Sequence, residues 1–242
     1  MGRRRQRHFN PATAGCHAVV DSRFGMVLYT GYPYPFVSEV AARVGTTYKM
    51  YDMLLSNSPQ QYSINGQACV RFFESSMGLI DNMTNPPAFA AGQSMFICSS
   101  VDASTSGYQR MVSSANDVYF ACGYLSQTLP LPSGIFSIAG NGTTWNDTDA
   151  NSPLVTTGPY AMCIKRELDT KITPTVNTTV QSQKVDSSSS YNADYVGRGP
   201  YPAVTQYLNG DIAMIAIGQT TGVPMDRRIL QMMGRVWRIH TL

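Results

Sequence analysis

Four arginines near the start of the chain are the residues with the clearest chemical potential. The first eight residues contain no acidic residue and include Arg3, Arg4, Arg5, Arg7 and His8. A guanidinium group can donate two parallel hydrogen bonds to one anion, and clustered arginines release condensed counterions when they bind a polyanion. These five residues therefore predict a nucleic-acid-binding arm over residues 1–15. A nuclear localisation signal or a solvated terminus is the alternative interpretation.

A second basic segment lies at the other end of the sequence, over residues 226–242. It has four arginines against one acidic residue, Asp226, and we predict that Arg228, Arg235 and Arg238 bind nucleic acid together with the arm. Residues 9–225 hold 10 basic and 14 acidic residues, so both ends are basic and the body is acidic. This layout predicts that the two ends converge on the same side of the folded chain.

The spacing of apolar residues in the second basic segment favours a helix. Apolar side chains recur at three- and four-residue intervals, at Ile229, Met232, Met233, Val236 and Ile239. That period places them on one face of an α-helix. On another face of the same helix fall Arg228, Gln231, Arg235 and Arg238. A strand over residues 235–242 remains the alternative, because that stretch does not separate cleanly into an inner and an outer side.

Acidic residues in one long polar loop could bind a metal ion. Asp147 and Asp149 stand beside two asparagines between residues 140 and 153, and calcium prefers such oxygen ligands. The spacing does not match an EF-hand loop, so an ordinary asparagine- and aspartate-rich turn is the default interpretation. We expect no other cofactor. Four of the five cysteines lie in apolar runs, where a thiol packs as a small apolar group: Cys69, Cys98, Cys122 and Cys163.

The elements that must position these residues read mainly as short strands. Nine β-rich runs are separated by turn residues, a pattern typical of an antiparallel β-sandwich. One short internal helix is predicted over residues 39–44, with Ser38 as its cap and Gly45 at its end. The nine runs cover residues 18–29, 46–55, 68–73, 94–101, 117–125, 135–139, 160–168, 172–180 and 211–217.

Composition narrows the class of protein further. No segment of the 242 residues reads as a linker between two cores, which favours one domain over residues 16–225. Charged residues make up only 14% and lysine is scarce, which is typical of a surface buried against copies of the same chain. An uncharged globular surface is the alternative. No apolar run approaches the length of a membrane span, and no apolar segment of a secretory signal follows the arginines. We therefore expect no membrane anchor and a reducing compartment.

Enzymatic motifs are not found in the sequence. The sequence contains no nucleophile elbow, no phosphate-binding glycine loop, no zinc-protease helix motif and no dinucleotide-binding motif. Acidic residues such as Asp102, Asp117, Glu167 and Asp169 are scattered, and only the fold could pair them as a glycosidase requires. The prediction is that the protein is not an enzyme.

An arginine-rich arm joined to a β-rich domain with long polar loops resembles the coat proteins of small icosahedral viruses. The resemblance implies an all-β, antiparallel sandwich of viral jelly-roll type. It also implies self-assembly into a shell of roughly 60 copies or a multiple. The basic ends would package a single-stranded RNA or DNA genome, in a virion assembled in the host cytoplasm or nucleus. The alternative is a β-sandwich binding module, either lectin-like or a non-viral nucleic-acid-binding protein.

Overall fold

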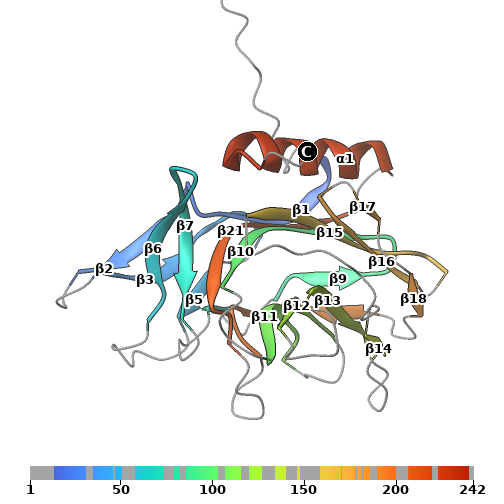
Figure 1. Cartoon of the computed structure of the whole chain (residues 1–242), viewed down its shortest axis with the longest axis horizontal. Helices are drawn as coiled ribbons and strands as arrows, with labels where there is room; N and C mark the ends of the chain where they lie inside the picture. The colour runs from blue at the N-terminus through green and yellow to red at the C-terminus, as the bar shows by residue number, and fades with distance from the viewer. Residues whose placement is uncertain are drawn as a thin grey trace, which may run out of the picture.

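The described residues fold into two large antiparallel sheets with one helix packed on the outside (Figure 1). This all-β architecture confirms the fold class predicted from the short runs, and each of the nine runs overlaps at least one strand. The computed structural model describes residues 14–30, 35–45, 47–50, 58–73, 79–81, 86–102, 107–115, 120–126, 134–139, 146–147, 159–169, 171–177, 179–180, 183–185, 190–199, 207–219 and 223–239.

The larger sheet has ten strands within the described residues. Seven of them follow one another in the order β17 (Thr179–Val180), β16 (Lys171–Val176), β15 (Tyr160–Arg166), β10 (Ser94–Val101), β21 (Gly210–Gly218), β1 (Cys16–Asp21) and β4 (Ala42–Val44). The other three pair at the side of this row: β6 (Gln60–Ile64), β7 (Gln67–Phe72) and β18 (Lys184–Val185). The first and last strands of this sheet along the chain, β1 and β21, are therefore neighbours.

The second sheet has nine strands in the described part of the chain. Their order is β14 (Asn146–Asp147), β13 (Gly134–Ala139), β12 (Phe120–Ser126), β11 (Gly107–Ser113), β20 (Tyr195–Val196), β8 (Leu79–Asp81), β5 (Tyr48–Met50), β3 (Phe36–Val40) and β2 (Met26–Tyr29). A separate pair joins β9 (Ala88–Ala90) to β19 (Ser190–Asn192).

Three central strands of the larger sheet, β10, β15 and β21, are buried on both faces. Along β10, Met95 and Ile97 face the core between the two sheets, whereas Phe96 and Cys98 face the helix. This alternation explains why such strands read as continuous apolar runs. The side toward the helix carries small residues on β15 and β21, which let the helix approach closely: Ala161, Cys163, Ala213 and Ala216.

The helix α1 (Val223–Trp237) lies across the outer face of the larger sheet (Figure 1). Ile229 and Met233 are buried against the sheet, as the three- and four-residue spacing predicts. Trp237, which that spacing did not include, is buried there too. Residues 235–237 therefore belong to a helix, as predicted, and not to the alternative strand. No described helix has the length and hydropathy that a membrane crossing requires.

The prediction of an internal helix over residues 39–44 is wrong. This segment forms β3 and β4, separated at residue 41. Val40 pairs with Met26 of β2 and Tyr48 of β5, and Val44 pairs with Val19 of β1. Cross-strand hydrogen bonds and burial outweigh the weak local helix signal of Ser38 and Gly45, because intrinsic propensity amounts to less than about 1 kcal/mol per residue.

Candidate ligand-binding groove

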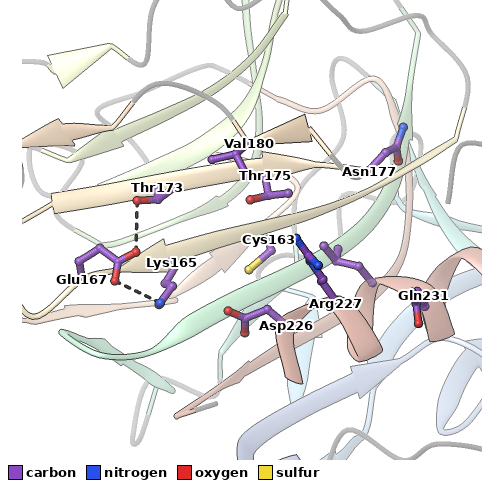
Figure 2. A pocket seen from close by; sticks show the side chains of 11 residues that line it. Cys163, Lys165, Glu167, Thr173, Thr175, Asn177, Val180, Asp226, Arg227 and Gln231 are labelled. Atoms are coloured by element: carbon purple, nitrogen blue, oxygen red, sulfur yellow. Dashed lines mark hydrogen bonds and ion pairs between the residues drawn. The ribbon is translucent and has the colours of Figure 1, made fainter. Parts of the chain in front are cut away.

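A groove of about 410 Å³ lies between the first half of α1 and the edge of the larger sheet. Figure 2 shows its lining side chains converging from the helix and the strands. Strands β15, β16 and β17, with the residue that directly follows each of the first two, contribute Cys163, Lys165, Glu167, Thr173, Thr175, Asn177 and Val180. The helix contributes Asp226, Arg227, Leu230 and Gln231.

The floor of the groove follows from strand periodicity. Along β16, Ile172, Pro174 and Val176 are buried, so the intervening Thr173 and Thr175 point to the opposite face. The antiparallel register places Cys163 opposite Thr175 and Lys165 opposite Thr173. Two neighbouring strands thus present alternate side chains to one cavity.

Hydrogen bonds fix several polar groups at the sheet side of the groove. Lys165 Nζ lies 3.2 Å from Glu167 Oε2, and Thr173 Oγ1 donates to Glu167 Oε1 at 3.3 Å (Figure 2). Gln183 Nε2 donates to Thr173 Oγ1 at 2.9 Å. At the far end, Asn177 Oδ1 accepts a hydrogen bond from the Ala161 amide at 3.1 Å, so the side chain is held in one orientation.

The helix side of the groove carries two residues of opposite charge, Asp226 and Arg227. Asp226 is buried in the first turn of α1, where a carboxylate interacts favourably with the helix dipole.

Burial raises the pKa of the Cys163 thiol well above its ordinary value, and the nearby charge of Asp226 raises it further. A thiol so held stays protonated at neutral pH, so Cys163 acts as an apolar wall and not as a nucleophile.

The structure places only some of the residues predicted to bind nucleic acid. Arg228 and Arg235 lie on the exposed face of α1, and Arg238 follows the helix, also exposed. The arm residues Arg3, Arg4, Arg5, Arg7 and His8 lie outside the described residues, so the predicted convergence of the two ends stays a prediction.

The predicted calcium ligands are not both covered by the structure. Asp147 belongs to β14, but its side chain and the whole of Asp149 lie outside what is described. Among the described residues, no three histidine, cysteine or acidic side chains come together as a metal site would require.

The groove itself was missed by the sequence analysis. A signal was present in the alternation of polar with apolar residues over 171–176, which marks one face of β16 as buried and the other as polar. The pairing of that face with β15 and with a helix about 50 residues later carries no local signal, so it could not be read from the sequence.

Comparison with known proteins identifies the fold only. No protein-family model matches the chain, and no curated protein matches it in sequence. Domain 4 of AbnA, a GH43 extracellular arabinanase from Geobacillus stearothermophilus solved in complex with arabinotriose, has a TM-score of 0.51 at 12% identity. That match covers 90% of this chain and 99% of the arabinanase domain.

Two larger proteins also contain a similar sandwich. Trypanosoma rangeli sialidase in complex with sialic acid has a TM-score of 0.56 at 7% identity, over 92% of this chain and 33% of the sialidase. An arabinofuranosidase complexed with arabinofuranosyl-alpha-1,2-xylobiose has a TM-score of 0.56 at 10% identity, over 91% of this chain and 59% of its own. The chain therefore corresponds to part of each of these two proteins.

These similarities contradict the interpretation of the chain as a capsid protein. They relate its sandwich to domains of carbohydrate-active proteins, and not to a homo-oligomeric viral shell around nucleic acid. The resemblance to coat proteins was architectural, and an antiparallel sandwich with polar loops and basic ends is not specific for a viral shell, because one fold carries many functions. The lectin-like alternative agrees better with the comparison.

Proposed function

We propose that the protein is a lectin-like β-sandwich module that binds oligosaccharides in the groove between α1 and strands β15 and β16. The lining of the groove carries this proposal. Hydroxyl, amide, carboxylate and ammonium groups face one cavity beside the apolar side chains of Val180 and Leu230. A sugar ring presents the complementary set, hydroxyl groups around its rim and apolar C–H groups on its faces, and small-molecule sites combine such features.

Similarity of fold supports the proposal independently of the groove. The arabinanase domain was solved with arabinotriose and the sialidase with sialic acid, and both contain a sandwich like this one. At 12% and 7% identity, the similarity does not transfer a ligand or a residue to this chain. The groove residues must therefore be tested directly.

Binding rather than catalysis is the proposed activity. Glycoside hydrolysis needs one carboxylic acid that donates a proton and a second carboxylate across the sugar. Glu167 is ion-paired with Lys165 and accepts a hydrogen bond from Thr173, an arrangement suited to accepting hydrogen bonds from sugar hydroxyls. Asp226, the other carboxylate of the groove, is buried in the first turn of α1.

The first test is a screen of immobilised oligosaccharides with the full chain, followed by calorimetry on the strongest binder. Gln231→Ala and Thr175→Val each remove one polar group of the groove. Each should raise Kd roughly fivefold, because a neutral hydrogen bond contributes about 1 kcal/mol.

Gln60→Ala is the matched control for Gln231→Ala, because Gln60 is also exposed but lies on β6, outside the groove. Its Kd should equal that of the unmodified protein. The proposal would be refuted by a screen without any oligosaccharide binder, or by groove variants that bind as tightly as the control.

A further inference from the structure

The exposed face of α1 carries positive charge only. Arg227, Arg228, Gln231 and Arg235 are exposed and fall within an arc of about 100° at 3.6 residues per turn, and the exposed Arg238 follows the helix. Asp226, the acidic residue of α1, is buried at 8% exposure. We call this set of four arginines the arginine face.

No acidic side chain among the described residues forms an ion pair with the arginine face. The ion pairs of the described residues involve other cations, for example Arg71 with Asp211 and Lys171 with Asp169. The guanidinium groups of the arginine face are therefore available to an external anion. Since Arg227 also lines the groove, this charged surface begins at the edge of the proposed sugar site.

A second cationic cluster, Arg23, Phe24 and Arg43, lies at the opposite end of α1. The Arg23 guanidinium stacks over the Trp237 ring at 4.9 Å and over the Phe24 ring at 5.0 Å. Arg43 lies over the same Phe24 ring at 4.7 Å. Phe24 is 49% exposed, so an apolar ring flanked by two guanidinium groups faces solvent.

A buried carboxylate holds the two arginines of this cluster in place. Arg23 donates to Asp21 through Nε at 2.9 Å and through Nη2 at 2.6 Å, and Arg43 Nη1 lies 3.9 Å from the same carboxylate. Asp21 is 1% exposed and balances only one of the two charges. The cluster is thus a fixed cationic surface with an apolar centre.

We infer that the ligand is an anionic oligosaccharide, carboxylated or sulfated, that extends from the groove along the arginine face to the Arg23, Phe24 and Arg43 cluster. The inference rests on the proposed function. The groove suits neutral sugar hydroxyls, whereas forked guanidinium groups suit carboxylate and sulfate oxygens. The 15 residues of α1 span about 22 Å, so the ligand must be several sugar units long to reach both ends.

The test compares a sulfated oligosaccharide derived from heparin with the same oligosaccharide after removal of its sulfates. The full chain should bind the sulfated form at least tenfold more tightly at low salt. The difference should shrink as sodium chloride is added, because exposed charge pairs are screened. Joint replacement of Arg228→Gln and Arg235→Gln should reduce affinity for the sulfated form about tenfold and leave binding of the desulfated form unchanged.

Two variants control for effects on folding and on total charge. Arg228→Lys with Arg235→Lys keeps the charge but lacks the guanidinium fork, so its affinity should lie between those of the glutamine pair and the unmodified protein. Lys171→Gln removes one positive charge on β16, away from α1, and should bind as the unmodified protein does.

Failure of this inference can be distinguished from failure of the proposed function. Equal affinity for the sulfated and desulfated forms, with both still weakened by Gln231→Ala, would overturn the anionic ligand and leave the sugar groove standing. Absence of binding to either form and to the whole oligosaccharide screen would overturn both. Equal competition by a single-stranded oligonucleotide of the same charge would also overturn the inference, since the arginine face would then bind any polyanion.

Discussion

The buried carboxylate of Asp211 is held by partners on two neighbouring strands. Asp211 of β21 accepts hydrogen bonds from Arg71 of β7 at 2.5 and 2.7 Å and from Ser100 of β10 at 2.7 Å. The carboxylate in turn raises the pKa of Arg71. Removing one partner of such a pair leaves a buried charge uncompensated, so these residues tie together β7, β21 and β10.

Asp194 should make stability fall as pH rises. Burial raises its pKa above the ordinary 3.8, although a hydrogen bond from the Ala115 amide opposes the shift. The folded state therefore binds the proton more tightly than the unfolded state. Its contribution to the free energy of unfolding is fully present below the unfolded pKa and is lost as pH rises through the folded pKa.

The measurement is the free energy of unfolding by urea at several pH values from roughly 3 to 6. Asp194→Asn should gain stability relative to the unmodified protein as pH rises through this window. Asp169→Asn is the matched control with the opposite sign, because the hydrogen bond from Lys171 lowers the pKa of Asp169. Parallel pH profiles for Asp194→Asn and the unmodified protein would contradict the assignment.

Among the elements, α1 depends on a hairpin that is distant in sequence. The turn between β6 and β7 is formed by Asn65 and Gly66, both with positive φ, at 49° and 82°. Asn65 Nδ2 donates to the carbonyl of Trp237 at 2.7 Å and to that of Arg238 at 3.3 Å. The backbone of Asn65 thus helps to form the hairpin turn, and its side chain satisfies carbonyl groups at the end of the helix.

Asn65→Gly separates these two roles, because glycine accepts positive φ without strain but cannot donate to the helix end. We expect a loss of about 1 kcal/mol in the free energy of unfolding. Asn65→Ala should lose roughly 1 kcal/mol more, since alanine also strains the turn. Urea unfolding measures both, and Asn65→Gly unfolding at the same midpoint as the unmodified protein would exclude the capping role.

At the scale of the whole molecule, a helix, a sheet and a second sheet form three layers around two apolar cores. One core lies between the sheets, and the other lies between α1 and the larger sheet. Both cores share β10, β15 and β21. The larger sheet is thus the common wall of the fold, and the groove lies where α1 leaves its edge strands partly uncovered.

The rates of amide hydrogen exchange should differ between strands according to their place in these layers. The amides of β10 and β21 should exchange slowest, because each strand is paired on both sides and buried on both faces. Those of β2 should exchange fastest among the strands compared, since β2 lies at a sheet edge and alternates between half-buried and exposed residues. Mass spectrometry of peptides from the three strands tests the order, and equal rates for β10 and β2 would contradict it.

Local sequence pattern was sufficient to predict the class of fold and the helix near the end of the chain. Apolar runs bounded by turn residues predict strands, because side-chain period and strand propensity act within a few residues. The three- and four-residue spacing from Ile229 to Ile239 predicts α1 for the same reason. The Asn65-Gly66 pair between β6 and β7 was an equally local signal that the sequence analysis did not use.

Only the tertiary structure decided which segments meet. The polar residues of β15 and β16 become a groove because a helix from the end of the chain packs beside them, and Arg23 joins that helix through Trp237. The arginines of the second basic segment were visible in the sequence, but their position beside a sugar-sized groove was not. Contacts between distant segments depend on the total burial of the folded chain, which no window of sequence contains.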